Sequence, residues 1–165
     1  MPKVLPSLAC LGLLLPGCAS THATTPATQL QVREYQTRAF DTPDAKLVMK
    51  AVLNTLQDEG FLVKSADAEL GLLTASRESD VGHRGDQLLA LLLDTGGRWK
   101  KLSVLEATVN VSAFGSETRV RLSFQRKTLD NQGGTLKVEP VAEPEFYQAF
   151  FAAVDKAVFI EKEKL

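Results

Sequence analysis

Cysteine is nearly absent from this sequence: Cys10 and Cys18 are its two cysteines, and residues 19–165 contain none. A domain built from residues 19–165 can therefore form no disulfide bond and offers no thiolate to a metal ion. Its stability must come from packing, even in an oxidising compartment. The sequence also has only two histidines, and histidine is the side chain that most often serves as a general base.

Known catalytic motifs are missing as well. The sequence contains no Gly-x-Ser-x-Gly, no phosphate-binding Walker loop and no His-Glu-x-x-His. Asp80, His83 and Asp86 have a spacing that could suit a metal ion, but such spacing is common in polar loops and a metal site needs rigid support. We therefore predict a protein that is not an enzyme and that holds no metal and no cofactor.

An excess of positive charge is also lacking. The formal net charge is −1, and removal of residues 1–17 would take away Lys3 and leave −2. Nucleic-acid-binding proteins show a clustered basic excess, so the composition argues against nucleic acid as a partner. It also argues against anionic lipid as the main contact. The apolar fraction of 44% is sufficient for the core of one globular domain.

The N-terminal residues have the features of a secretory signal, which we place at residues 1–17. Lys3 supplies the positive start, residues 5–15 are mostly apolar, and Gly17 is a small residue at the cleavage site. The apolar segment is shorter than the about 20 residues that cross a bilayer. Leu15-Pro16-Gly17-Cys18 resembles the lipobox of bacterial lipoproteins. This resemblance implies cleavage before Cys18 and acylation of that cysteine; the alternative is an ordinary signal peptide.

A lipid on Cys18 would make the membrane itself a partner of this protein. Each buried methylene group contributes about 0.8 kcal/mol, and more than one acyl chain gives stable anchoring. By analogy with lipoprotein sorting, Ala19 in place of aspartate favours the outer membrane and its periplasmic face. Residues 18–29 are rich in threonine and alanine and cannot bury a core, so we predict a flexible tether there.

Residues 30–165 are predicted to form a single α+β domain with an insert near residues 79–101. The expected order is β-α-β-β-insert-β-β-(β)-α, a helix-grip-like arrangement with a mainly antiparallel sheet and two helices packed on one face. The first strand is expected at residues 30–40. The first helix is expected to begin with Thr42 as its cap and Pro43 at its first position.

Alternation and helical spacing locate the other elements. Gly60 is expected to end the first helix. Strands are expected at residues 61–64 and 72–77, which a short turn makes antiparallel, and residues 135–138 suit an edge strand. Polar and apolar residues alternate through residues 104–113 and 119–125, which indicates a hairpin with one buried face. Its expected buried residues are Leu105, Ala107, Val109, Val111, Ala113, Val120, Leu122 and Phe124. The last helix is expected to bury Phe146, Phe150, Val154, Ala157 and Val158.

Four segments together resemble a group of small, poorly characterised bacterial outer-membrane lipoproteins. They are residues 55–61, 71–75, 147–151 and 159–162. The layout is also similar to the helix-grip modules of BamC, an accessory lipoprotein of the outer-membrane protein assembly machine. The shared motifs are structural, and neither resemblance implies a catalytic residue.

The insert contains the strongest candidate for binding a partner. Residues 88–93 are very rich in leucine, and Trp99 is the one tryptophan of the chain. A contiguous apolar patch marks an interaction site, and tryptophan is a frequent interface anchor. The alternative is that this segment folds over the sheet and joins the core. The candidate partner-binding residues are Leu88, Leu89, Leu91, Leu92 and Trp99.

Positive residues on the hairpin offer a second candidate surface. We expect Arg119 and Arg121, followed by Arg126 and Lys127, to place positive charge on the exposed face of the hairpin. One interpretation is a solvated strand face with cross-strand partners such as Glu106. The other is a docking surface for an acidic partner or an anionic glycan.

These observations favour a membrane-anchored periplasmic lipoprotein that acts as a non-enzymatic accessory or scaffold of a cell-envelope complex, with an envelope protein as its partner. The alternative function is a binding module for a small apolar or lipid-like ligand. That alternative requires a pocket of several hundred Å³ between the helices and the sheet. Its walls would come from Phe61, Val109, Leu122, Phe150 or Val154.

Overall fold

The computed structural model describes residues 28–80, 82 and 99–163. Within these ranges, no helix combines the length and the apolar character needed to cross a bilayer. The elements, in chain order, are α1 (Gln29–Tyr35), β1 (Thr37–Phe40), α2 (Ala45–Asp58), β2 (Leu62–Asp67), β3 (Leu72–Asp80), β4 (Lys100–Phe114), β5 (Glu117–Asp130), β6 (Thr135–Pro140) and α4 (Pro144–Glu163).

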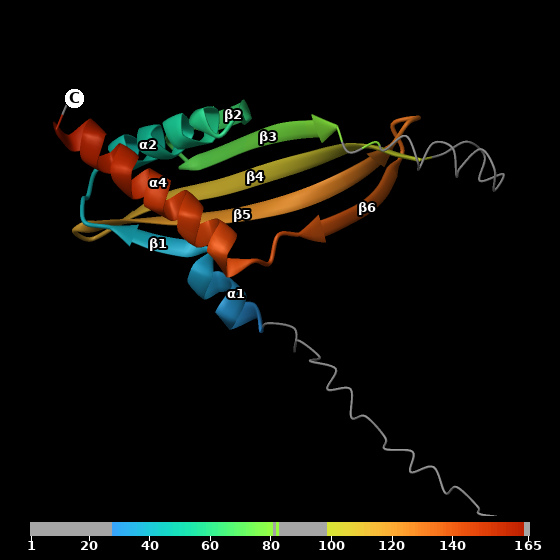
Figure 1. The fold of residues 1–165 in the computed structure, drawn as a ribbon. Helices are drawn as coiled ribbons and strands as arrows, with labels where there is room; N and C mark the ends of the chain where they lie inside the picture. The colour runs from blue at the N-terminus through green and yellow to red at the C-terminus, as the bar shows by residue number, and fades with distance from the viewer. Residues whose placement is uncertain (1–27, 81, 83–98, 164–165) are drawn as a thin grey trace, which may run out of the picture.

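The strands form one six-stranded antiparallel sheet in the order β1-β5-β4-β3-β2, with β6 also paired to β5 (Figure 1). The outer edge of β5 thus has two partners: β1 pairs with residues 118–121 and β6 with residues 125–129. The α+β class and the antiparallel sheet agree with the prediction. The pairing of β1 with β5 brings the start of the domain beside a strand about eighty residues later, and no local sequence signal predicts it.

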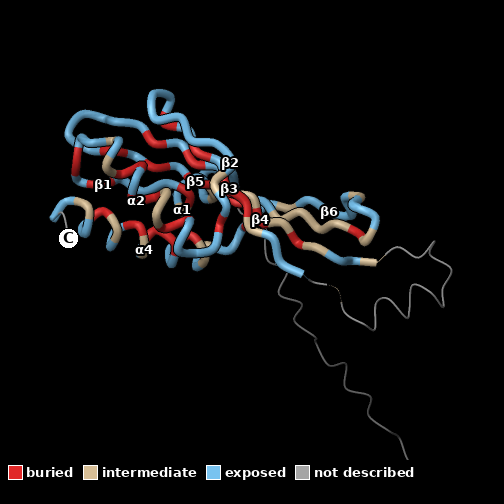
Figure 2. The backbone as a smooth tube through the Cα atoms, turned by 90° about the horizontal axis from the view of Figure 1, so that it is seen from above, coloured by how far each residue is buried: buried red, intermediate tan, exposed pale blue. Residues whose placement is uncertain are grey.

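One face of the sheet carries the core. The directly opposed pairs Ala107–Phe124, Val109–Leu122 and Val111–Val120 are all buried, and α2 and α4 pack over this face (Figures 1 and 2). Contact with both helices removes these side chains from water, which is the main stabilising contribution to such a fold. Ala113 was expected on this face as well, but it is exposed because it lies near the end of the hairpin.

Helix α2 begins two residues later than predicted. Asp44 is its N-cap, and one carboxylate oxygen accepts a hydrogen bond from the Leu47 N–H at 3.0 Å. The predicted cap, Thr42, instead accepts a hydrogen bond from the Asp44 N–H at 3.3 Å, and Pro43 precedes the helix. The prediction for the other end is confirmed, because Gly60 follows the C-cap with a φ of +79°.

The predicted strand at residues 30–40 is wrong in its first half. Thr28 and Gln31 form a reciprocal capping box, which starts α1 one residue inside the range predicted for the tether. Leu30 is 78% exposed, so α1 is not held by burial of that residue. The chain then enters β1 at Thr37, where the strand prediction holds.

Helix α4 buries the predicted Phe150, Val154 and Val158, and also Tyr147, which was not predicted. The Tyr147 hydroxyl accepts hydrogen bonds from Gln36 Nε2 and the Phe124 N–H, both at 3.2 Å, and donates one to the Val141 carbonyl oxygen at 3.0 Å. In β5, Phe124 follows the residues that pair with β1 and precedes those that pair with β6. One side chain therefore closes the gap between the two edge strands.

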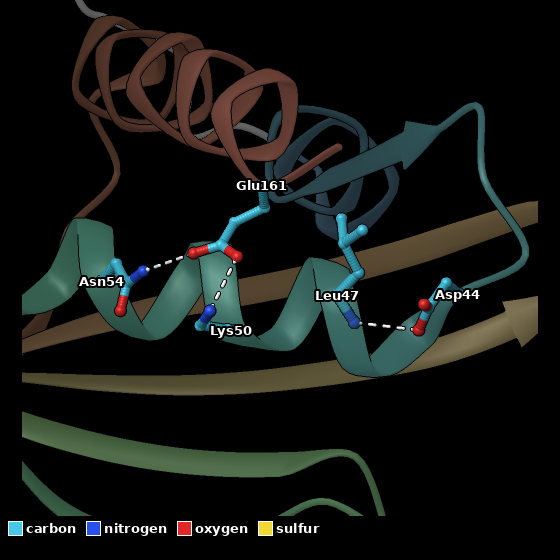
Figure 3. A network of polar contacts seen from close by, with 5 residues as sticks. All are labelled: Asp44, Leu47, Lys50, Asn54 and Glu161. Carbon is cyan, nitrogen blue, oxygen red and sulfur yellow. Dashed lines mark hydrogen bonds and ion pairs between the residues drawn. The ribbon is translucent and has the colours of Figure 1, made fainter. Parts of the chain in front are cut away.

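A second polar network joins the far end of α4 to α2. Figure 3 shows Glu161 between Lys50 and Asn54: Lys50 Nζ lies 2.8 Å from one carboxylate oxygen, and Asn54 Nδ2 donates to the other at 3.0 Å. Lys162 Nζ also donates to the Asp41 carbonyl oxygen at 2.7 Å. These contacts fix the C-terminal turns of α4 over the middle of α2 and the segment before it.

Candidate functional site

Helices α2 and α4 both lie on one face of the sheet, so neither helix covers the opposite face (Figure 1). Strand alternation places on it the residues that lie between the core positions. In β4 they include Thr108, Asn110 and Ser112, and these three are exposed. We call this surface the open face.

The character of the open face changes along the strands. Toward the ends of β4 and β5 that lie near β6, the partly exposed Leu102 and Leu129 oppose each other. Next to them, Lys127 Nζ lies 2.7 Å from a Glu106 carboxylate oxygen, so these two charges compensate each other. In Figure 2, few residues around β6 are buried.

The middle of the open face is polar and hollowed. A depression of about 230 Å³ spans β2, β3 and β4. It lies beside an irregularity in the pairing of β2 with β3, between Val63 and Ser65. Its polar lining residues are Lys64, Thr74, Ser76, Glu106 and Thr108.

The hairpin end of the open face is basic. Arg121 lies opposite Asn110 in β4 and Thr37 in β1, and two residues earlier Arg119 lies on the same face. The guanidinium of Arg119 stacks 3.9 Å above the ring of Phe114, which is itself 61% exposed. Such a cation–π contact holds the guanidinium in place without neutralising its charge.

Helix α1 adds a third arginine beside Arg121. Arg33 in the last turn of α1 and Arg121 line one hollow of about 290 Å³, together with Gln29, Val32 and Gln36. Neither arginine has a carboxylate within ion-pair distance among the described residues. Glu117, two residues before Arg119 on the same face of β5, supplies one negative charge against the three arginines. This end of the open face therefore has uncompensated positive charge.

The other side of α1 forms a larger hollow with α4, of about 380 Å³. Its arginine is compensated locally, because Arg38 lies 3.8 Å from Asp155 and over the ring of Phe151. Tyr35 also lines it, and the Tyr35 hydroxyl is buried with no hydrogen-bond partner among the described residues. Burial, followed by the nearby Tyr147 and Glu143, raises the pKa of Tyr35. Glu34 also lines this hollow and has no cationic partner among the described residues, so the hollow offers no free positive charge.

The predicted basic row is corrected by the strand register. Arg126 lies opposite the buried Leu105, so it belongs to the helix-covered side of the sheet, and it pairs with Glu139 at 4.0 Å. Lys127 pairs with Glu106, as one interpretation expected. Arg119, Arg121 and Lys127 keep the predicted placement on the open face, and of these three Lys127 is the one that is paired with a carboxylate. Arg33 was missed because its segment was predicted to be a strand.

The other predicted site residues are mostly outside the described residues. This applies to Cys18, to Leu88, Leu89, Leu91 and Leu92, and to His83 and Asp86. The Trp99 backbone bonds Asn131 in the turn after β5, through its N–H at 3.2 Å and its carbonyl oxygen at 3.1 Å. Asp80 accepts a hydrogen bond from the Gly82 N–H at 2.9 Å. No metal-binding cluster occurs within the described ranges.

The residues named for a lipid-like pocket form part of the packed core. Their exposed fractions lie between 0% and 6%. One hollow touches two of them, Phe61 and Phe150, and its volume is about 100 Å³. This volume is well below the several hundred Å³ of a typical ligand pocket.

Comparisons with known proteins identify no family. No family model matches the sequence, and no curated protein matches it. Among solved structures, the chain is similar to a DUF4468 family protein from Bacteroides ovatus ATCC 8483, with 11% sequence identity and a TM-score of 0.39. The match covers 74% of this chain and 84% of that protein.

Proposed function

We propose that this protein is a lipid-anchored lipoprotein of the outer membrane, on its periplasmic face, that acts as a non-enzymatic accessory or scaffold. In this proposal the open face holds an envelope component close to the membrane. The lipobox-like residues 15–18 support the anchor. The open face supports the binding role, since one side of the sheet is packed and the other presents polar groups and uncompensated arginines.

The anchor is tested by replacing the cysteine. Cys18→Ser removes the thiol that would carry the lipid, so we expect the variant to leave the outer-membrane fraction and to appear in the soluble periplasmic fraction. The wild-type chain, fractionated in parallel, is the control. A variant that still sediments completely with the outer membrane would show that the lipid on Cys18 is not the anchor.

The binding role of the open face is tested by site-specific photo-crosslinking in cells. A photoreactive residue replaces Thr108 on the open face in one variant, and Ala152 on the outer surface of α4 in the other; both positions are exposed. We expect specific adducts from position 108 and none from position 152. Equal adduct patterns from both positions would contradict a role for the open face.

The alternative of a lipid-like ligand has less support from the geometry, because the residues that would line its pocket are packed against one another. Native mass spectrometry of the full chain would detect a retained lipid other than the anchor. We expect none.

A further inference from the structure

We propose that the open face binds a carboxylate-bearing glycan of the cell envelope, and that Arg33, Arg119 and Arg121 contact its carboxylates. This inference rests on the proposed function, because it names the class of component that the open face holds. Arg33 and Arg121 line the same hollow and lack an acidic partner within the described ranges. A guanidinium can bind both oxygens of a carboxylate.

The placement of the three arginines suits a ligand with repeated acidic groups. Arg119 and Arg121 are two residues apart on one strand, so their Cα atoms are about 7 Å apart. Arg33 approaches Arg121 from a different element, α1, and shares its hollow. A single buried anion would need one enclosed site, whereas these side chains lie on an exposed surface formed by β5 and α1.

The surface next to the arginines is suited to sugar hydroxyl groups. The exposed side chains of Thr108, Asn110 and Ser112 are hydrogen-bonding groups without charge. The polar depression at Lys64 and Thr74 continues this surface across β3 to β2. Four strands span about 14 Å at the usual strand spacing. A polymer can therefore contact the arginines and the depression at the same time.

An acidic protein is favoured less by the same residues. Protein interfaces have apolar and aromatic centres, and their energetically dominant residues are tryptophan, tyrosine and arginine. Beside the arginines the open face has Thr108, Asn110 and Ser112 instead. Its exposed leucines, Leu72 and Leu62, lie at opposite ends of the β2–β3 pairing and form no common apolar centre. The exposed aromatic ring of Phe114 lies at the end of the face, under Arg119.

The test uses the full-length chain, purified from membranes in a neutral detergent, and insoluble cell-wall sacculi as the glycan. We expect the wild-type protein to sediment with sacculi at low salt. The double variant R33Q/R121Q should bind about tenfold more weakly, since each exposed ion pair contributes modestly. The control R126Q/K137Q removes the same charge from residues that pair with Glu139, and it should bind as the wild type does.

Two further measurements identify the chemistry. Sacculi whose carboxylates have been amidated should no longer bind the wild-type chain. The melting temperature of R33Q/R121Q should match that of the wild type, which excludes unfolding as the cause of weaker binding. If the wild type does not sediment with sacculi, or if R33Q/R121Q sediments as the wild type does, the inference is wrong.

The outcome of the crosslinking experiment separates this inference from the proposed function. Adducts with a protein from position 108, abolished by R33Q/R121Q, together with no binding to sacculi, would overturn the glycan and indicate an acidic protein partner. The binding role of the open face would then stand. Absence of both adducts and sacculus binding would overturn both.

Discussion

The bridging hydroxyl of Tyr147 gives the sharpest stability prediction. Tyr147→Phe keeps the ring in the core but removes the oxygen that accepts from Gln36 Nε2 and the Phe124 N–H and that donates to the Val141 carbonyl. A buried polar group left without a partner costs about 1–3 kcal/mol. Among the described residues, the Tyr147 hydroxyl is the hydrogen-bond acceptor of the Phe124 N–H, and Gln36 is 7% exposed. We expect a loss of about 2–4 kcal/mol in the free energy of unfolding.

The structure supplies a matched control for this change. The ring of Tyr35 lies 5.1 Å from that of Tyr147, centroid to centroid, but its buried hydroxyl has no hydrogen-bond partner among the described residues. Tyr35→Phe should therefore leave the stability unchanged or increase it by up to about 1 kcal/mol. Denaturant unfolding of both variants, followed by circular dichroism, measures the difference. Equal stabilities of the two variants would refute the argument that the Tyr147 hydrogen bonds hold the sheet edge.

Three further predictions concern packing, backbone geometry and pH. Phe150→Ala should lower the free energy of unfolding by about 3–5 kcal/mol. Phe159→Ala on the same helix should change it little, because that ring is 60% exposed. Thermal or chemical denaturation of the two variants measures the difference. Gly71→Ala should cost at least about 3 kcal/mol, because the new Cβ would lie 1.9 Å from a backbone oxygen of β4. Gly115→Ala has a similar φ but no atom within 4 Å, so the same denaturation assay should show a cost of about 1 kcal/mol. Because the pKa of Tyr35 is raised in the folded chain, this hydroxyl ionises first in the unfolded chain. The free energy of unfolding should therefore fall above about pH 10, and it should fall less in Tyr35→Phe. Denaturant unfolding at a series of pH values measures this.

The sequence predicted those elements whose signals are local and strong. The stripe of Val48, Val52 and Leu56 repeats with helical spacing, and Gly60 marks the end of α2. The long hairpin of β4 and β5 shows strict alternation, because one of its faces is buried and the other is wet. In both cases the burial pattern that the fold imposes is already visible along the chain.

The sequence failed where two patterns compete or where a partner is distant. Leu30 and Val32 fit either a strand or a short helix, and the capping signal of Thr28 and Gln31 was the feature that could have decided between them. Tyr147 was missed because a tyrosine enters a core when polar groups from other elements meet it, and those groups lie far away in sequence. The basic pair of Arg33 and Arg121 depends in the same way on the contact of α1 with β5.

Strand β1, near the start of the domain, and helix α4, at its end, both bond to β5. These contacts constrain the order in which the chain can fold. Gln36 and Tyr147 are separated by 111 residues, and β1 pairs with β5. Contacts so distant in sequence close late, because a long loop must first be ordered. A chain that crosses a membrane with its N-terminus first would thus expose α1 and β1 on the far side before their partners arrive. β1 would stay exposed until β5 arrives and α1 until α4 arrives, so a chain truncated before α4 would leave α1 exposed to chaperones and proteases.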